Sequence, residues 1–213
     1  LPHEELIERL QRFKAVVLIN YDNIDNLDDH ISVINVESYQ TMADLLEGLI
    51  ALGRRDFVYL STEFGGYPAD KRKQAFVDTL TRHNLYTGSD QIFSGTDSAE
   101  YGGYHAVRQI FSRLPNTDAI VAFSDLMATG VLKACADQGI QVPDDVAVTG
   151  FDDSSTAAFT IPALTTAHVA RFEIGVKATE NIFDRLKGKP VKKVEMSIPK
   201  LMWRDSTLSN MNG

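Results

Sequence analysis

Polar side chains stand where apolar runs of the sequence stop, and their types could bind a hydroxyl-bearing small molecule. Asp152 follows the apolar run 146–151, and a carboxylate there can accept two hydrogen bonds from a polyol. Arg72 lies one helical turn before Phe76 in a predicted helix. Its planar guanidinium could reach into a cleft and grip hydroxyls or a carboxylate. The alternative interpretation of Arg72 is an ordinary surface arginine.

The same pattern recurs after three other apolar runs of strand length. The residues concerned are Asn20, Ser61, Thr62, Ser124 and Asp125. Ligands bind outside the carboxyl ends of the strands in open parallel sheets, so these side chains are candidates for one binding site. Ser124 or Asp125 could instead cap the helix that follows, and Asp153 could be a turn residue.

No sequence pattern of an enzyme or a metal protein is present. The chain lacks the Gly-x-x-x-x-Gly-Lys-Ser/Thr, Gly-x-Gly-x-x-Gly and Gly-x-Ser-x-Gly motifs. Its five histidines, at positions 3, 30, 83, 105 and 168, show no metal-ligand spacing. The single cysteine, Cys135, is interpreted as a buried hydrophobic residue. We therefore expect no catalytic residues, no metal and no cofactor.

Short apolar runs alternate with amphipathic segments of helical length along most of the chain. The predicted helices are 2–10, 39–52, 69–83, 99–113, 125–138 and 172–186. The predicted strands are 15–19, 31–36, 57–60, 90–93, 119–123, 146–151 and 194–198. This alternation is typical of βαβ units, so we predict an α/β fold whose parallel sheets are covered by helices on both faces.

The composition is that of a globular protein and excludes several classes. Of the 213 residues, 44% are hydrophobic and 23% are charged. The net charge of −8 argues against nucleic-acid binding by the chain as it stands. No apolar run approaches the roughly 18 residues of a membrane span. The first residues contain neither a Met nor a signal peptide, so we expect part of a longer, cytoplasmic protein.

Four motifs in register carry a family resemblance. Residues 123–130 are similar to the run Asn-Asp-x-Met-Ala-x-Gly, and residues 139–153 match a second signature almost completely. Residues 162–166 contain Pro-x-Leu-Thr-Thr, and residues 203–207 contain Arg-x-Ser-Thr. Together these motifs, spread over 15–207, resemble the effector-binding region of the lactose/galactose-repressor (LacI/GalR) family of bacterial transcription regulators.

The resemblance implies a two-lobed, periplasmic-binding-protein-like (type I) fold with an effector in the cleft between the lobes. The partial N-terminal lobe would comprise 1–37 and 168–198, and the C-terminal lobe 38–167 and 199–213. About three βα units precede position 1 in that family, so we expect the first lobe to be incomplete, with an exposed strand edge and apolar face. The resemblance also implies a homodimer that binds operator DNA through a helix-turn-helix domain absent from this chain.

The resemblance assigns roles to individual positions. The implied effector-binding residues are Asn20, Arg72, Ser124, Asp152 and His168. Ser124 replaces a usual Asn, and Val169 stands where many members have Gln. The two changes remove two amide groups from the expected pocket, so the sequence leaves the identity of the effector open between sugars and related metabolites.

Thr129 and Thr160 fall at positions that the family uses in its dimer interface, and both could equally be ordinary helix and loop residues.

Two other functions compete with a regulator. A solute-binding protein of a sugar transporter has the same fold but needs a secretion signal. An enzyme of doubly wound fold needs a nucleophile–base pair or a phosphate loop, and the sequence shows neither.

Overall fold

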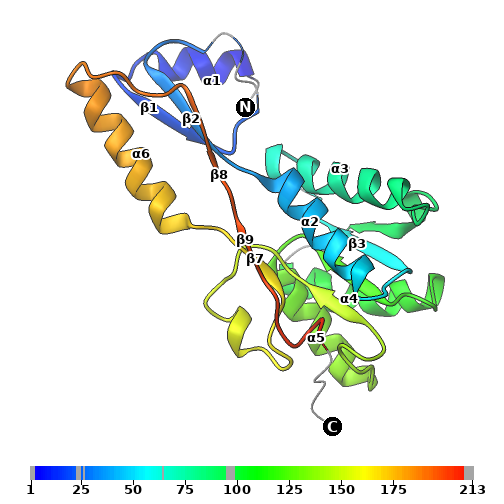
Figure 1. Cartoon of the computed structure of the whole chain (residues 1–213). Coiled ribbons are helices and arrows are strands. Elements are labelled where there is room, and N and C mark those ends of the chain that lie inside the picture. Colours follow the sequence, from blue (N-terminus) through cyan, green and yellow to red (C-terminus); the bar gives the residue numbers. More distant parts are fainter. Residues whose placement is uncertain (1–2, 23–24, 26, 64, 95–98, 209–213) are drawn as a thin grey trace.

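The computed structural model describes residues 3–22, 25, 27–63, 65–94 and 99–208. It confirms the α/β fold, with two parallel sheets flanked by helices (Figure 1). The three-stranded sheet has the order β1-β2-β8, formed by β1 (Val16–Ile19), β2 (Ile31–Val36) and β8 (Val194–Ser197). The four-stranded sheet has the order β4-β3-β5-β6, formed by β3 (Phe57–Ser61), β4 (Ile92–Ser94), β5 (Ala119–Ala122) and β6 (Ala147–Thr149).

Helices cover both faces of the four-stranded sheet. The helices are α2 (Ser38–Ala51), α3 (Tyr67–Arg82), α4 (Ala99–Arg113) and α5 (Asp125–Gln138). Along β3, Phe57 and Tyr59 belong to the core with α2 and α3, whereas Val58 and Leu60 belong to the core with α4 and α5. Because successive side chains of a strand point to opposite faces, a strand buried on both faces is apolar throughout.

The helices α1 (His3–Leu10) and α6 (Arg171–Leu186) accompany the three-stranded sheet at the other end of the molecule (Figure 1). The chain passes between the two parallel sheets three times. The first passage leads from β2 into α2, the second from β7 (Thr166–His168) into α6, and the third from β8 into β9 (Lys200–Met202). The strands β7 and β9 pair antiparallel beside the junction of the two parts.

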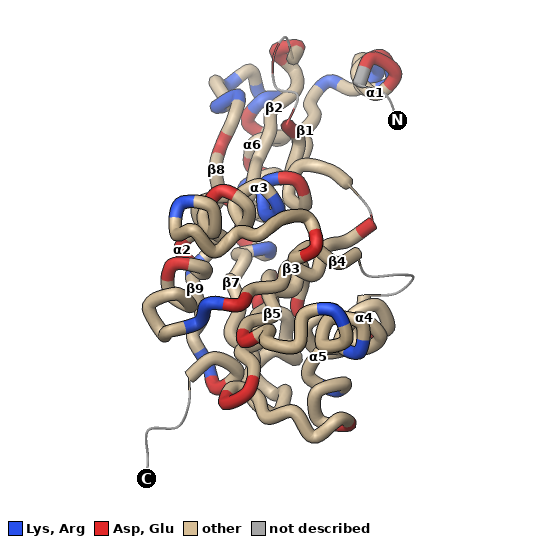
Figure 2. Tube along the Cα trace, turned by 90° about the vertical axis from the view of Figure 1, so that its right-hand side faces the viewer, with Lys and Arg blue, Asp and Glu red and all other residues tan. Residues whose placement is uncertain are grey.

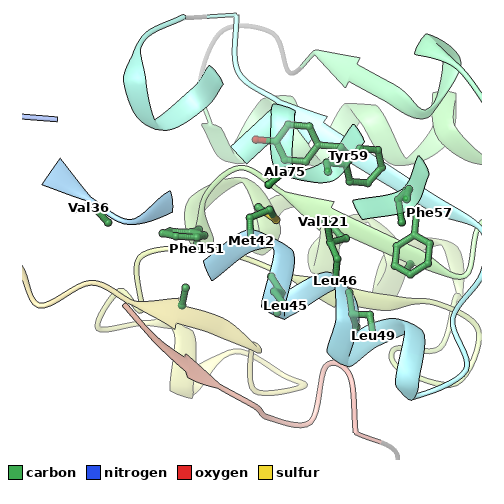
Figure 3. Packing of buried hydrophobic residues seen from close by; sticks show 14 of the residues in the cluster. Val36, Met42, Leu45, Leu46, Leu49, Phe57, Tyr59, Ala75, Val121 and Phe151 are labelled. Atoms are coloured by element: carbon green, nitrogen blue, oxygen red, sulfur yellow. The ribbon is translucent and has the colours of Figure 1, made fainter. Parts of the chain in front are cut away.

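Side chains from both parts meet at this junction. Phe151, which follows β6, belongs to one buried cluster with Val36 at the end of β2 and Met42 of α2. Figure 3 shows the Phe151 ring between these two residues. The ring therefore links the end of the three-stranded sheet to the core of the four-stranded one.

The observed elements differ from the predicted ones in detail. The strand predicted at 15–19 is β1, which is half-buried because it lies at a sheet edge. The strand at 194–198 is not the final one, because β9 follows it. The helix predicted at 39–52 ends at Ala51, so Leu52 follows α2 and is exposed. The strand β7 was not predicted.

The surface of the three-stranded part includes apolar side chains. Ile19 of β1 and the α6 residues Phe172, Val176, Phe183 and Leu186 are exposed. Phe172, Val176 and Phe183 lie along a groove of about 1190 Å³ that begins at Arg171. Acidic and basic segments are interleaved over both parts of the chain (Figure 2). The expected strand edge and apolar surface are therefore present.

Candidate functional site

Arg72 is a buried residue of α3 that reaches the carboxyl ends of two strands. The residue is 5% exposed, and its Nη1 donates a 2.6 Å hydrogen bond to the carbonyl oxygen of Phe123, directly after β5. The guanidinium carbon lies 3.6 Å from the centre of the Phe151 ring and 4.7 Å from that of Phe123. Cations are attracted to the faces of such rings. The two phenylalanines therefore hold the guanidinium at the strand ends, which excludes the surface interpretation of Arg72.

Asp152 lies beside this guanidinium. Its Oδ1 is 3.9 Å from Arg72 Nη2. Burial raises the pKa of the Asp152 carboxyl above its usual value, and the positive charge of Arg72 offsets part of that rise. Burial likewise lowers the pKa of Arg72, although a guanidinium remains charged in proteins. The structure thus brings two of the sequence-predicted effector residues together.

This pair retains capacity for hydrogen bonds. Arg72 Nε is buried and has no hydrogen-bond partner within the described residues, and the 3.9 Å contact to Asp152 is longer than a hydrogen bond. A buried polar group without a partner is costly, so it needs an explanation such as a bound water or ligand. A ligand hydroxyl could both donate to the carboxylate and accept from the guanidinium.

His168 makes its observed side-chain contact with Asp153, the neighbour of Asp152. Its Nδ1 lies 2.9 Å from Asp153 Oδ2, and Arg204 Nη2 donates to Asp153 Oδ1 at 2.7 Å. Burial acts to raise the pKa of Asp153, but the hydrogen bonds from Arg204 and His168 outweigh it and the pKa is lowered. The structure therefore places His168 in a network that anchors the loop after β6 rather than against Arg72.

Asn20 and Ser124 also lie at strand ends, but each makes a local contact. Asn20 adopts a left-handed conformation with φ of 56°, and its Oδ1 accepts a 3.0 Å hydrogen bond from the Val36 amide. This contact joins the end of β1 to the end of β2. Ser124 Oγ accepts a 3.4 Å hydrogen bond from the Met127 amide and is the N-cap of α5. Ser124 thus caps α5, as its alternative interpretation predicted.

Sequence reasoning missed Phe123 and Phe151 as functional residues. Each stands directly before a polar residue at a strand end, and this position could have identified both rings as neighbours of the site. Asp125 was considered only as a candidate strand-end ligand or cap. It is 1% exposed, and its carboxylate accepts hydrogen bonds from the Ser154 amide and the Thr166 hydroxyl.

The two predicted interface threonines lie on other surfaces of the four-stranded part. Thr129 donates to the carbonyl of Asp125 and lines a groove of about 560 Å³ between α4 and α5, together with Tyr101. Thr160 donates to the carbonyls of Ala157 and Pro162. Its neighbours Phe159 and Ile161 are 85% and 92% exposed, so an apolar surface surrounds Thr160.

The described part of the chain contains no cluster of three or more His, Cys, Asp or Glu side chains that could hold a metal ion. None of its described helices combines the length and apolar character needed to cross a membrane. Burial raises the pKa of the Cys135 thiol to about 12. This thiol is fully buried, in agreement with its interpretation as a hydrophobic core residue.

Residues 46–207 match the family described as "Periplasmic binding protein-like domain". The chain belongs to this family. A curated relative, the HTH-type transcriptional repressor PurR of Mannheimia succiniciproducens, is 31% identical over 74% of this chain and 47% of its own length. PurR of Pasteurella multocida is 25% identical over 98% of the chain and 62% of its own length. The chain thus spans about half to three fifths of these two relatives.

Solved structures agree with this membership. A LacI-family transcriptional regulator from Lactobacillus casei with bound glucose is 26% identical, with a TM-score of 0.78 over 95% of this chain and 83% of that one. The resemblance to the lactose/galactose-repressor regulators is therefore confirmed. Arg72 and Asp152 both lie within the residues that match the periplasmic binding protein-like domain.

Proposed function

We propose that the chain is the effector-binding region of a LacI-type transcription regulator. A small molecule, a sugar or a related metabolite, binds at Arg72 and Asp152 in the cleft between two lobes. The first lobe comprises 1–37 and 168–198, and the second 38–167 and 199–213. The observation that carries the proposal is the apposition of a buried guanidinium and a half-buried carboxylate at the strand ends.

The positions of the two groups support this function. Arg72 and Asp152 lie at the carboxyl ends of β5 and β6, where ligands bind in open parallel sheets. Phe151, at this edge, shares a buried cluster with Val36 of the three-stranded sheet, so the site adjoins the junction between the proposed lobes. Asn20, Ser124 and His168 complete the proposed lining, although their observed side-chain contacts are with Val36, Met127 and Asp153.

Binding at this junction can control a regulator only through a difference in affinity. An effector shifts an equilibrium between two lobe arrangements when it binds one arrangement better than the other. In this proposal, the change reaches operator DNA through a helix-turn-helix domain outside this chain, in a cytoplasmic protein without enzymatic activity. The relatives support a regulator over a transport protein, because the curated relatives reported above are repressors.

Homodimerisation is the second part of the proposal. Thr160 lies between two side chains that are almost fully exposed, Phe159 and Ile161. Thr129 lines a groove with exposed Tyr101. Exposed apolar groups that gather on one surface are typical of protein–protein contacts, and we infer that these two surfaces contribute to the dimer.

A thermal-shift screen of this chain tests the effector site. The probes are glucose, cellobiose, adenosine, guanosine and glucose 6-phosphate. A compound present at 100 times its dissociation constant should stabilise the folded chain by about 2.7 kcal/mol. Asp152→Asn should abolish that stabilisation. Asp44→Asn, which changes an exposed carboxylate on α2 that accepts from Gln40, should retain it. A compound that stabilises the Asp152 variant as much as the unmodified chain contradicts the assignment.

A further inference from the structure

The backbone that carries Asp152 is held in an uncommon conformation. Asp152 has φ of 119° and Asp153 has φ of 50°. Residues other than glycine rarely adopt positive φ, and each such residue costs roughly 1–3 kcal/mol unless its surroundings enforce it. The direction of the Asp152 carboxylate therefore depends on contacts that hold residues 151–154.

Asp125, the first residue of α5, supplies contacts on both sides of this segment. Its backbone amide donates to the Phe151 carbonyl at 3.0 Å, before Asp152. Its carboxylate Oδ2 accepts from the Ser154 amide at 2.5 Å, after Asp153. One residue thus fixes the chain at both ends of the two positive-φ residues.

A third contact runs through Thr166 of β7. The Thr166 hydroxyl donates to Asp125 Oδ1 at 2.5 Å and accepts from the Asp153 amide at 3.3 Å. The hydroxyl therefore relays the charge of Asp125 to the amide that directly follows Asp152. The carboxylate of Asp125 orients two consecutive backbone amides, those of Asp153 and Ser154.

The packing at Gly150 shows that the carboxylate and the loop are fitted closely together. A Cβ atom at Gly150 would stand 2.4 Å from Asp125 Oδ1 and 3.0 Å from the Asp125 Cα. Such distances are far below ordinary van der Waals contact, so the approach requires a glycine. The loop after β6 thus wraps around a carboxylate that is itself 1% exposed.

We propose that Asp125 is a positioning residue of the effector site, whose buried carboxylate, directly and through Thr166, holds the Asp152 backbone so that the Asp152 carboxylate lies beside Arg72. The inference rests on the proposed function for the meaning of the site, but the geometry that it concerns exists without a ligand. Asp125 itself does not touch the effector.

The test measures Asp152 by NMR in the ligand-free chain, with selective ¹³C labelling of aspartate. In Asp125→Asn and in Thr166→Val, the amide couplings of residues 152 and 153 should lose the values that belong to positive φ. The midpoint of the Asp152 carboxyl titration should fall toward its ordinary value of 3.8 in both variants. In Asp125→Asn a nearby negative charge is removed and the burial of the loop is reduced, whereas in Thr166→Val only the burial is reduced. Thr166→Ser keeps the hydroxyl and should restore both readouts.

Asp118→Asn is the matched control. Asp118 precedes β5, and its carboxylate also accepts from backbone amides, those of Arg55 and Asp56, at 2.9–3.1 Å. Its replacement should lower the thermal stability of the chain while leaving the couplings and the titration of Asp152 unchanged. A merely structural role for Asp125 would give the same result in both aspartate variants.

Unchanged couplings and an unchanged Asp152 midpoint in Asp125→Asn overturn the inference. If Asp125→Asn does not fold, the comparison of Thr166→Val with Thr166→Ser decides, and equal Asp152 readouts in those two variants overturn it. Glucose and cellobiose titrations provide a separate arm. A failure of both sugars to bind the unmodified chain would count against a sugar effector in the proposed function, whereas the ligand-free NMR result would still decide the role of Asp125.

Discussion

The guanidinium of Arg72 lies on the ring of Phe151, with 3.6 Å between the guanidinium carbon and the ring centre. The same ring belongs to one buried cluster with Val36, at the end of the three-stranded sheet. Ligand contacts made by Arg72 would therefore act on a side chain that also contacts the junction between the two parts of the molecule. This relationship connects binding chemistry to the arrangement of the parts through a single aromatic ring.

Replacement of Arg72 by lysine should destabilise the chain. Lysine lacks the planar group that stacks on Phe151 and leaves Asp152 without its neighbouring guanidinium. We expect Arg72→Lys to lower the free energy of unfolding by about 1–3 kcal/mol, measured by urea denaturation at pH 7.

Arg113→Lys is the matched control for this loss. Arg113 also pairs with a carboxylate, at 3.0 Å from Asp90, and lies 5.0 Å from the Phe93 ring centre, but it is exposed. Exposed pairs contribute little, so we expect a change within about 0.5 kcal/mol. Equal decreases in the free energy of unfolding for the two lysine variants would show that the burial of Arg72 at the strand ends does not increase its contribution to stability.

The neighbouring carboxylates Asp152 and Asp153 should contribute to stability with opposite dependence on pH. The folded-state pKa of Asp152 is raised, mainly by burial. Its contribution is therefore most favourable below the unfolded pKa near 3.8 and is lost as the pH rises through the folded value. The folded-state pKa of Asp153 is lowered because the bonds to Arg204 and His168 outweigh its burial. Its stabilisation is present above the unfolded pKa and is lost as the pH falls through the folded value.

Urea denaturation between pH 3 and pH 7 measures this contrast. The stability difference between the unmodified chain and Asp152→Asn should decrease as the pH rises from about 4. For Asp153→Asn, the corresponding difference should decrease as the pH falls below about 4. Parallel profiles in the two variants would mean that Asp152 and Asp153 share one environment, contrary to the structure.

Glycine-to-alanine substitutions in two helices should change the free energy of unfolding in opposite directions. A Cβ atom at Gly130 of α5 would lie 1.9 Å from the Glu100 carbonyl oxygen of α4. Gly130→Ala would force the two helices apart and should lower the free energy of unfolding by more than about 2 kcal/mol. Gly175 of α6 has open space around the same position, so alanine should stabilise the chain by about 0.5–1 kcal/mol through its higher helix propensity. Thermal unfolding of both variants provides the check.

An aspartate at Ile161 should weaken the association of two chains. Ile161 is 92% exposed beside Thr160, and burial of a charge in an apolar interface is unfavourable. In the proposed homodimer, sedimentation velocity should show association of the unmodified chain and a monomer for Ile161→Asp at the same concentration. Ile198→Asp, at an exposed isoleucine that follows β8, should leave the dimer intact. Loss of the dimer in both variants would point to a general effect of charge.

Local sequence patterns predicted most elements because the spacing of apolar residues within a segment distinguishes a helix from a strand. The bounds of α4 and α5 agree with the predicted 99–113 and 125–138. The strands β7 and β9 have three residues each, too few to establish a period. They form because the chain returns twice to the same junction, where distant backbone groups complete each other's hydrogen bonds.

Residue types and spacing alone placed polar groups at strand ends, and the family resemblance predicted which of them bind an effector. The sequence could not decide between neighbours such as Ser124 and Asp125, since both can cap a helix. Tertiary structure assigned the cap to Ser124 and turned Asp125 toward Ser154 and Thr166. The sequence by itself thus determined the βα units and the candidate polar residues. Only the packing of separate units decided that Arg72 lies beside Asp152, because that contact depends on how α3 crosses the ends of β5 and β6.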